Sequence, residues 1–498
     1  MRELVKYRLL EIFPGTLVWI TFALAIVFSF IQPLWVMAFI IIYDAYWLVR
    51  LLYLEIFLII GYTRYRKALR VDWKKILEGK PGFDDVYHIV LYPTYKESLE
   101  VMETSFEALR LSQYPNMKDR MIVVLAGEEA DKENFLQIAA SCEKRYAQYF
   151  KKFLITLHPS NVPGELPGKG SNIHYAGKKF QEYCDQESIP YTKVLVSSFD
   201  ADTRVHPMYF SYLTCVYLDH PRRLRSSYQP NALFNNNVWD APSFARVVSF
   251  STTFWLMTEQ IRPERLFTFS SHSMPLQALV DVGFWQNDIV TEDSRICLQC
   301  MQHYDGDYEV TPLYIPVSMD VVLGKSLWQT IKSQYIQQRR WAYGAENFPF
   351  MVWNFLPNKK MAWTKKIRYI WNQFEGSYSW ATAPILIFIL GRLPLLALSE
   401  VERQSALALN TPHILQILLR FSLLGVILSA VLGTTLLPKR PKGVPRRNIL
   451  YMIIQWPLIL VSMIFFGSLP AADALTRLMF GKYLGFEVTQ KIRKRSAV

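Results

Sequence analysis

The sequence predicts an α/β domain with a mixed, mostly parallel sheet, inserted between transmembrane helices. Three observations support this fold class. Long stretches without charge lie towards both ends of the 498-residue chain. Between them, short apolar runs alternate with segments of helical spacing. The net charge changes sign where the apolar stretches meet this central block.

The positive charge of the chain is concentrated beside the apolar stretches. The chain has 55 Lys+Arg and 42 Asp+Glu, a formal net charge of +13. Residues 83–344 have 25 basic and 30 acidic residues, whereas residues 61–82 have seven against two and residues 345–498 have 19 against six. A nucleic-acid-binding protein carries its basic residues on the folded domain that makes the contact, so no nucleic-acid partner is expected. The basic segments are instead typical of regions that contact anionic membrane lipids.

Two transmembrane helices are predicted near the N-terminus. No charged residue occurs between Glu11 and Asp44, and Gln32-Pro33 divides this stretch. A bilayer core requires about 20 apolar residues, so we expect spans at 14–31 and from about 34 onwards. No short apolar segment with a small-residue cleavage site is evident, so a removed signal peptide is not expected.

Three further apolar segments follow the central block, at about 377–397, 413–437 and 449–468. The basic segments 64–80 and 359–368 place the central block in the cytoplasm by the positive-inside rule. The basic loop after the second segment and the basic C-terminal tail have the same preference. Three full crossings would put the tail outside, so we expect the last segment to lie in the membrane interface or to re-enter.

The chain is therefore expected to be an integral protein of the plasma (inner) membrane with its α/β domain in the cytoplasm. Its expected regions are a membrane region (1–62), the α/β domain (83–325), interfacial helices (326–376), a second membrane region of two or three helices (377–480) and a basic tail (481–498).

The central block alternates strands and helices. The expected strands are Val86–Tyr92, Met121–Ala126, Phe153–Leu157 and Val194–Ser198, and the expected helices are Glu97–Leu111, 131–148, a helix from about 171, and 207–218. Continuous apolar runs bounded by turns indicate buried parallel strands. In such sheets ligands bind beyond the carboxyl ends of the strands, so the residues there are candidates for the site.

All five cysteines of the chain fall in this block, where a reducing cytoplasm makes disulfides improbable. Cys297 and Cys300 lie near His303, but no second pair completes a zinc site. A buried helix face is the preferred interpretation of this cluster.

Asp200 and Asp202 follow a buried strand and would point the same way if the strand remained extended. Carboxylates together with substrate phosphates suit Mg²⁺ or Mn²⁺. The alternative is a loop and helix-capping pair.

Adjacent acidic residues, Glu292 and Asp293, follow Thr291. One carboxylate could act as a general base on an acceptor hydroxyl. These residues could equally begin a helix, since Thr291 is a good cap.

The first strand ends near Tyr95 and Glu97, which could stack on a base and bond a ribose. Glu97 could instead begin the following helix, where an acidic residue favours the dipole.

Gln337, Arg340 and Trp341 end an amphipathic stretch and suit pyrophosphate binding and stacking on a sugar. The alternative is an interfacial helix whose arginines reach the lipid headgroups.

The segment Gly164–Ser171 resembles a phosphate-binding loop, but it has one residue too few between its glycines, and Gly170 follows the lysine where Ser or Thr is needed. An ATPase is therefore not expected. A loop that presents Lys169 and Asn172 to a phosphate or a sugar remains open.

Taken together and in their order along the chain, these motifs resemble those of the processive membrane glycosyltransferases, the cellulose, hyaluronan and chitin synthases. The resemblance extends to the tail, where Phe486-Glu487-Val488-Thr489-Gln490-Lys491 is similar to the gating loop of cellulose synthases. It spans nearly the whole chain.

The resemblance implies a GT-A fold and inverting transfer from a nucleotide-diphosphate sugar, with a UDP-sugar as the expected donor. It implies that Asp202 ligates Mg²⁺ or Mn²⁺, that Asp200 lies near the ribose or the metal, and that Asp293, with Glu292 beside it, is the base. It further implies pyrophosphate contacts from Gln337 and Arg340, an acceptor contact from Trp341, and closure over the nucleotide by Thr489 and Lys491.

One departure concerns the nucleotide base. The related enzymes carry an Asp at the end of the second strand, where this sequence has Ala126-Gly127-Glu128-Glu129. Glu128 would replace that Asp. Only about five spans are visible, fewer than in cellulose synthase, which bears on whether the polymer crosses the membrane.

The leading hypothesis is an enzyme that extends a polysaccharide or glycolipid at the cytoplasmic face. The runner-up is a single addition to a lipid acceptor. A transporter would need more ionisable residues within its spans than Arg392 and Arg420. A non-enzymatic membrane scaffold remains if the acidic motifs are only helix caps.

Overall fold

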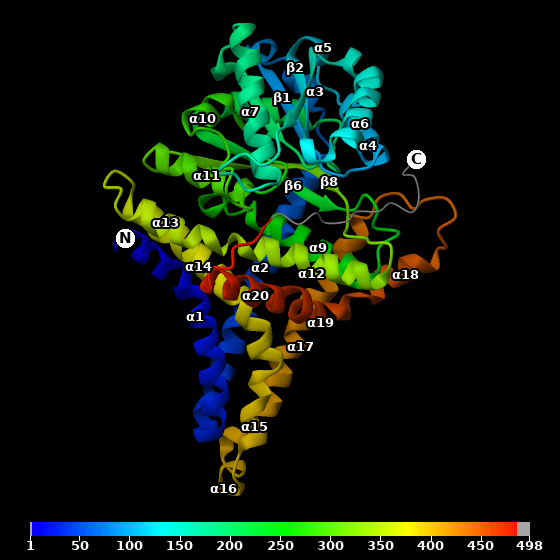
Figure 1. The fold of residues 1–498 in the computed structure, drawn as a ribbon. Coiled ribbons are helices and arrows are strands. Elements are labelled where there is room, and N and C mark those ends of the chain that lie inside the picture. Colours follow the sequence, from blue (N-terminus) through cyan, green and yellow to red (C-terminus); the bar gives the residue numbers. More distant parts are fainter. Residues whose placement is uncertain (1, 486–498) are drawn as a thin grey trace.

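The computed structural model describes residues 2–485 and consists of an α/β domain above a bundle of long apolar helices (Figure 1). Five helical segments of the described chain are long and apolar enough to cross a membrane. They are Glu3–Ile31, Pro33–Ala68, Trp363–Ala397, Ala406–Thr435 and Arg447–Met479. This finding agrees with the expected number of spans, although the first helix begins well before residue 14.

Four of these segments run along the bundle: α1 (Arg2–Ile31), α2 (Pro33–Ala68), α14 (Trp363–Phe388) with α15 (Leu393–Ala397), and α17 (Ala406–Thr435). The fifth consists of α18 (Arg447–Ile454), α19 (Ile459–Met463) and α20 (Leu469–Met479), which lie across the bundle rather than along it (Figure 1). Pro457 and Pro470 fall in this segment and interrupt regular α-helix.

The domain contains an eight-stranded mixed sheet in the order β3-β2-β1-β4-β7-β6-β8-β5. Its strands are β1 (Tyr87–Pro93), β2 (Met121–Glu128), β3 (Lys152–His158), β4 (Val194–Ser198), β5 (Arg204–Val205), β6 (Ser226–Phe234), β7 (Ser273–Pro275) and β8 (Glu309–Met319). The pairs β1–β2, β1–β4, β2–β3 and β6–β8 are parallel, and β7 and β5 pair antiparallel with their neighbours. The expectation of a mixed, mostly parallel sheet is confirmed.

Helices cover both faces of this sheet. The major helices of the domain are α4 (Leu99–Arg110), α6 (Lys132–Tyr146), α7 (Lys169–Gln186), α8 (Tyr209–Asp219), α9 (Ser243–Glu259), α10 (Leu276–Asp281) and α11 (Glu292–His303). Val90 and Tyr92 of β1 join the core formed with α4 and α6, whereas Ile89 and Leu91 join the core formed with α7, α10 and α11. The alternation along β1 thus fills two cores, because successive side chains of a strand point to opposite faces.

Helix α12 (Leu327–Ala342) lies between the α/β domain and α20, at the level where the domain meets the bundle (Figure 1). Arg339 of α12 forms an ion pair with Asp473 of α20 at 3.1 Å. The following helices are η7 (Tyr343–Glu346) and α13 (Asn347–Phe355). These elements join the α/β domain to the bundle.

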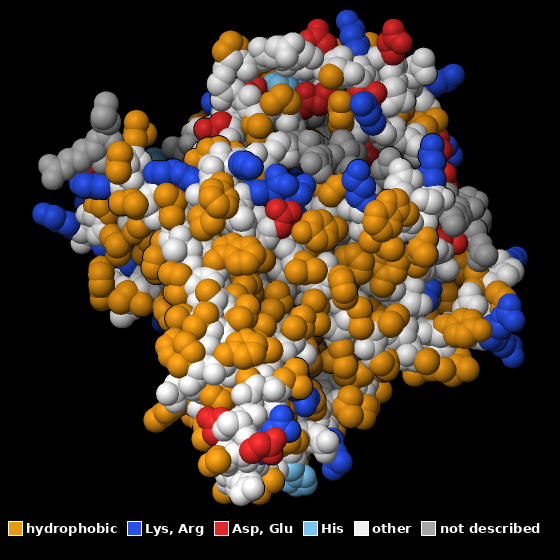
Figure 2. Space-filling model, turned by 60° about the horizontal axis from the view of Figure 1, so that its bottom comes forward, with side chains coloured by type: hydrophobic (Ala, Val, Ile, Leu, Met, Phe, Trp, Pro, Cys, Tyr) orange, Lys and Arg blue, Asp and Glu red, His pale blue; other side chains and the backbone are white. Residues whose placement is uncertain are grey.

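The surface of the bundle is mostly apolar. Figure 2 shows hydrophobic side chains over most of the face turned forward, with Lys and Arg along its upper edge and charged residues again at the tip. Ile42, Ile427 and Ile454 are among the exposed apolar residues. The tip carries α16 (Glu400–Arg403), whose N-terminus is closed by a capping box from Ser399.

Candidate active site

The predicted site residues gather at the carboxyl edge of the parallel strands. Tyr95 and Glu97 follow β1, Glu128 ends β2, and Asp200 follows β4. The register pairs Pro93 with Ala126, so β1 and β2 end side by side. This is the edge at which open α/β sheets bind ligands.

Asp200 and Asp202 do not lie on an extended strand. Strand β4 ends at Ser198, and Thr203 N–H donates to Asp200 O at 2.9 Å, which closes a turn. The side chain of Asp200 is partly exposed, whereas Asp202 is buried and its Oδ2 accepts the N–H of Asp320 at 2.7 Å. The expectation that an extended strand aligns the two carboxylates was wrong in this respect.

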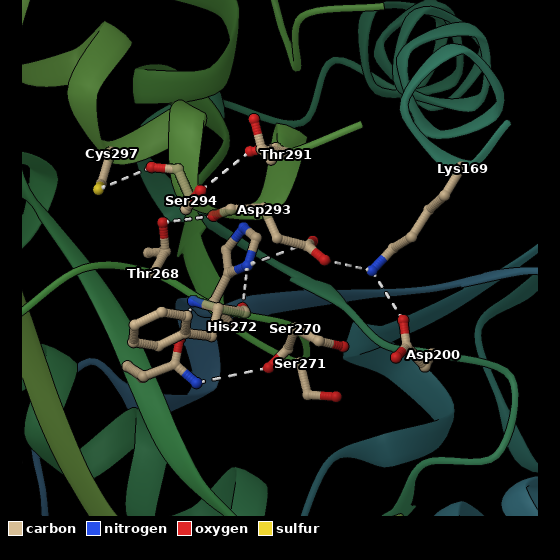
Figure 3. Close-up of polar contacts among 12 residues, drawn as sticks. Lys169, Asp200, Thr268, Ser270, Ser271, His272, Thr291, Asp293, Ser294 and Cys297 are labelled. Carbon is tan, nitrogen blue, oxygen red and sulfur yellow. Dashed lines mark hydrogen bonds and ion pairs between the residues drawn. The ribbon is translucent and has the colours of Figure 1, made fainter. Parts of the chain in front are cut away.

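Lys169, the first residue of α7, joins two of the predicted acidic residues (Figure 3). Its Nζ donates to Asp200 Oδ1 and to Asp293 Oδ2, both at 2.7 Å. Burial acts to lower the pKa of Lys169, but the carboxylates of Asp200, Asp293 and Glu292 outweigh it and raise this pKa. A lysine cation therefore links the Asp200 motif with the acidic pair that begins α11.

Glu292 is buried beside Asp293 at the start of α11. Burial, followed by the charge of Asp293, raises the pKa of Glu292 to about 8, while Lys169 and Arg340 act in the opposite direction. Arg340 of α12 therefore lies close enough to influence the acidic pair. The structure brings the two motifs, more than 40 residues apart in the sequence, to one site.

Side-chain contacts with η7 and α13 hold the start of α11 in place. Thr291 Oγ1 donates to Glu346, and Arg295 donates to Asn347 Oδ1 at 2.7 Å. The guanidinium of Arg295 also stacks over the ring of Phe350 at 4.1 Å. These contacts fix the orientation of the first turn of α11, which carries Asp293.

Glu128 forms part of a cluster that the sequence analysis missed. His158 at the end of β3 contacts Glu128 Oε2 through Nδ1 at 2.9 Å and Glu165 Oε2 through Nε2 at 2.8 Å. Glu165 also accepts from Asn287 at 2.9 Å. Glu128 Oε1 is buried and has no hydrogen-bond partner within residues 2–485, so it remains available as an acceptor for a ligand.

The remaining predicted residues make contacts of their own. Gln337 is buried and accepts from Gln334 at 3.3 Å, and the ring of Trp341 packs 5.9 Å from that of Phe234 at the end of β6. The ammonium of Lys96 lies 4.9 Å from the ring of Tyr95. Thr489 and Lys491 lie outside the described residues.

The acidic residues of the site fit a hard divalent cation held jointly with a substrate. Among residues 2–485, no group of three or more His, Cys, Asp or Glu side chains forms a metal cluster. Mg²⁺ commonly binds through one or two carboxylates, with phosphate and water oxygens completing its shell. Asp200 and Asp202 supply carboxylates of this kind.

The cysteines do not contribute to the site. All five are free and buried, and Cys297 and Cys300 lie on the inner face of α11. The interpretation of these residues as a buried helix face is confirmed.

Comparison with known proteins identifies the class. Residues 195–466 match the family described as Glycosyl transferase family group 2, so the chain belongs to this family. Together with the mixed sheet, this defines a GT-A-like glycosyltransferase fold, and the protein is an enzyme of that type. Comparison with curated protein sequences gives no match.

Two solved structures are similar to the chain at low identity. A mannosyltransferase, PcManGT from Pyrobaculum calidifontis in complex with GDP-Man and Mn²⁺, is 13% identical, with a TM-score of 0.43 over 86% of this chain and 99% of that one. Residues 1–349 of TarS from S. aureus are 12% identical, with a TM-score of 0.34 over 72% of this chain and 98% of that one.

Proposed function

We propose that the protein is an inverting, metal-dependent glycosyltransferase that uses a nucleotide-diphosphate sugar, with a UDP-sugar as the expected donor. The observation that carries this proposal is the contact of Lys169 with both Asp200 and Asp293 at the carboxyl edge of the sheet. This contact joins Asp200, a proposed metal ligand, to Asp293, the candidate base, within one site of a family-2 glycosyltransferase fold.

Asp293 is the proposed base. Its carboxylate takes the proton of the acceptor hydroxyl while the acceptor oxygen forms the new bond to the anomeric carbon and the diphosphate leaves with the electrons of the broken bond. Such proton transfer by a positioned carboxylate contributes about 10²–10⁴-fold to a rate. Burial, followed by the charge of Asp293, raises the pKa of Glu292 to about 8, so Glu292 is largely protonated at neutral pH and is not the proposed base.

Asp202 and Asp200 are the proposed ligands of Mg²⁺ or Mn²⁺, which when bound would stabilise the negative charge of the leaving diphosphate. Arg340, with Gln337, is proposed to hold the same diphosphate, since a guanidinium binds phosphate oxygens in pairs. Lys169, in contact with Asp200 and Asp293, adds a second fixed cation to the site. Fixed charges of this kind act without reorganisation during the reaction.

Glu128, Tyr95 and Glu97 are the proposed nucleoside contacts. Glu128 Oε1, which has no hydrogen-bond partner within residues 2–485, would accept from a base that carries an N–H donor. Both uracil and guanine carry such donors. A donor panel is therefore needed to assign the base.

The enzyme is proposed to act at the cytoplasmic face of the plasma (inner) membrane. The loop after α17 contacts the α/β domain, because Asn235 donates to Leu436 O and Trp239 donates to Pro438 O. The crosswise path of α18, α19 and α20 supports the proposal that the last segment does not cross the membrane, since four crossings would leave the N-terminus, the domain and the basic loop on one side.

The acceptor is proposed to be a growing polysaccharide or a glycolipid, and Trp341 is its proposed contact. Single addition to a lipid acceptor is the second candidate, and the exposed Leu327 and Trp328 at the start of α12 favour it, because they offer an apolar surface to a lipid. The size distribution of radiolabelled products separates the two: a ladder indicates processive extension, and one discrete lipid-soluble product indicates single addition.

The central experiment offers the detergent-purified protein a panel of UDP-, GDP- and nucleotide-monophosphate sugars with Mn²⁺ or Mg²⁺ and measures nucleotide release. Release from none of these donors would contradict the proposal. Asp293→Asn should retain donor binding but lose transfer by at least about 100-fold, and transfer near the wild-type rate would show that another group is the base. Asp202→Asn should weaken metal-dependent donor binding, and unchanged binding would exclude Asp202 as a ligand.

A further inference from the structure

A single histidine joins two glutamates at the carboxyl edge of the sheet. His158, the last residue of β3, places Nδ1 2.9 Å from Glu128 Oε2 and Nε2 2.8 Å from Glu165 Oε2. A carboxylate oxygen only accepts hydrogen bonds, whereas a neutral imidazole has one N–H group and one lone pair. Both contacts with ionised glutamates are therefore hydrogen bonds only when both ring nitrogens carry a hydrogen. The geometry fits the imidazolium form of His158.

The surroundings of His158 favour this charged form. Its side chain is 5% exposed, and the ring of Tyr175 on α7 packs against it with the ring centroids 5.5 Å apart. Burial acts to lower the pKa of His158, but the hydrogen bonds and charges of Glu128 and Glu165 outweigh it and raise this pKa. The cluster therefore holds a cation between two carboxylates up to at least about pH 6.5.

Glu165 is held from a second direction. Its Oε1 accepts from Asn287 Nδ2 at 2.9 Å, and the N–H of Leu166 donates to Asn287 O, also at 2.9 Å. These contacts attach the loop formed by residues 159–168 to the segment that leads into α11. Glu165 is therefore a fixed partner for His158, although the loop around it is largely exposed.

Glu128 has one oxygen in this bridge and one outside it. Oε2 contacts His158, whereas Oε1 has no hydrogen-bond partner within residues 2–485. The side chain of a glutamate has several rotatable bonds, and ordering it on binding costs conformational entropy. A contact that already fixes Oε2 also fixes the direction of Oε1, so less freedom is lost when a ligand binds there.

A second histidine near the site makes no such bridge. His272 Nδ1 lies 2.9 Å from Phe269 O and 3.9 Å from Asp293 Oδ1, so its hydrogen bond goes to the backbone and not to the carboxylate (Figure 3). Burial lowers the pKa of His272, which favours its neutral form. Of these two histidines, His158 is the one that joins carboxylates.

We propose that His158 is a positioning residue for donor binding: as the bridge between Glu128 and Glu165, it holds Glu128 with Oε1 directed to the nucleoside base. This inference rests on the proposed nucleoside contact of Glu128. The contacts run from Asn287 through Glu165 and His158 to Glu128. His158 keeps both of its hydrogens and takes no part in proton transfer. Lys169 keeps its own contacts with the two aspartates, so the bridge acts on donor binding and not on the chemical step.

Nucleotide binding tests this role without turnover. Isothermal titration calorimetry of the detergent-solubilised protein with UDP and with GDP, in the presence of Mn²⁺, identifies the nucleotide that the wild type binds more tightly, and this nucleotide is the probe. In His158→Gln a single amide nitrogen replaces two ring nitrogens and cannot contact both glutamates. This variant should raise the Kd of the probe about 10-fold. With a donor found in the panel, KM should rise equally and kcat should stay within about threefold.

Glu165→Gln removes a charge but can preserve both hydrogen bonds. Its amide nitrogen can donate to Nε2 of a neutral His158, whose Nδ1–H still donates to Glu128, and its amide oxygen can still accept from Asn287. At about pH 6.5 this variant should bind the probe within about twofold of the wild type. As the pH rises further, the wild type should lose affinity as His158 loses its proton, whereas Glu165→Gln should not.

His174 supplies the matched control. It lies half-buried on α7, and its Nδ1 contacts the backbone oxygen of Trp285 at 2.8 Å. His174→Gln should leave the Kd of the probe within about twofold of the wild type at each pH. An unchanged Kd in His158→Gln, or parallel pH profiles in the wild type and Glu165→Gln, would overturn the positioning role.

Glu128→Gln separates this role from the proposal on which it rests. It should weaken binding of the probe about 10-fold, because it removes the charged acceptor of the base. Wild-type binding by Glu128→Gln would contradict the nucleoside contact itself, as would a wild type that binds neither UDP nor GDP. Weakened binding in Glu128→Gln with wild-type binding in His158→Gln would leave that contact in place and overturn only the role of His158.

Discussion

At the scale of single residues, the centre of the site is held by unlike charges in contact. Lys169 is 12% exposed and shares its ammonium between Asp200 and Asp293. Each charge-assisted hydrogen bond of this kind contributes about 1.5–3 kcal/mol. Removing the lysine leaves two partly buried carboxylates facing each other.

We therefore predict that Lys169→Met lowers the stability of the protein by about 2 kcal/mol. Mn²⁺ should raise the melting temperature of this variant more than that of the wild type, because the lysine no longer competes for Asp200. Thermal unfolding in detergent, with and without Mn²⁺, measures both effects.

Lys179, half-exposed on the same helix and paired with Glu182, supplies the control. Lys179→Met should change neither the stability nor the response to Mn²⁺ by more than about 0.5 kcal/mol. An equal response in both variants would contradict a direct competition between Lys169 and a metal ion.

A second prediction concerns pH. Burial acts to lower the pKa of His158, but the adjacent Glu128 and Glu165 outweigh it and raise this pKa. A group whose pKa is raised on folding contributes its stability below the unfolded value, about 6.5 for histidine, and loses it as the pH rises through the folded value.

The melting temperature of the wild type should therefore fall from acid to alkaline pH, above about pH 6.5, by more than that of His158→Gln. Melting curves across this range test the expectation. Parallel pH profiles for the two proteins would show that His158 is not charged between the two glutamates.

At the scale of elements, the position of α7 decides where Lys169 lies. The sequence predicts a helix from about 171, and the structure begins it at Lys169, directly after Gly168. The middle of the helix packs closely on the loop after α10: a Cβ on Gly177 would lie 2.4 Å from the ring of Phe284. Glycine is required here by the close approach of the aromatic ring.

Gly177→Ala should accordingly destabilise the protein by about 1–3 kcal/mol, because overpacking outweighs the helix propensity of alanine. Gly376 of α14 is the control, since a Cβ there meets nothing within 4 Å, and Gly376→Ala should be neutral or stabilising by up to about 1 kcal/mol. Thermal unfolding compares the two variants. A stable Gly177→Ala would mean that Phe284 can move aside without cost.

At the scale of the whole molecule, polar contacts join the bundle to the catalytic domain. Arg64 of α2 donates to Tyr314 Oη of β8 at 2.6 Å, and Arg339 of α12 pairs with Asp473 of α20. The apolar helices of the bundle therefore fix the position of α12, and with it that of Arg340, relative to the sheet. This arrangement predicts which parts of the chain lie on each side of the bilayer.

Single cysteines at Val401 and Lys442 test this topology. Val401 is 83% exposed at the tip of the bundle, Lys442 is exposed in the loop near the domain, and the five native cysteines are buried. A membrane-impermeant maleimide should label Val401→Cys in intact cells and Lys442→Cys only after permeabilisation. The reverse pattern would contradict a cytoplasmic catalytic domain.

The sequence predicted most of the elements, because their signals are local. The strands β1, β2, β3 and β4 begin and end within about two residues of the predicted ranges, since continuous β-branched runs bounded by turns leave little choice. The turn that separates Asp200 from Asp202 was not predicted. Its geometry depends on β8, whose end supplies the N–H of Asp320 from more than 100 residues away.

The residues of the candidate site likewise fall into those that the sequence predicted and those that it did not. The acidic motifs, Lys169 and the motif at Gln337–Trp341 were visible in the sequence because their residue types and spacing are unusual. His158 and His272 were missed, because a single histidine in an apolar run gives no signal until the fold places carboxylates beside it. The local signals for these two histidines were weak: His158 is the polar last residue of β3, and His272 follows two serines just before β7.

By itself, the sequence determined the class of fold, the apolar helices and the acidic motifs, since periodicity, charge and spacing are properties of the chain. Only the tertiary structure decided which acidic residue is buried, which lysine links the two motifs and which histidine faces the proposed base. These properties depend on distances between residues far apart in the chain, and such distances are set by packing.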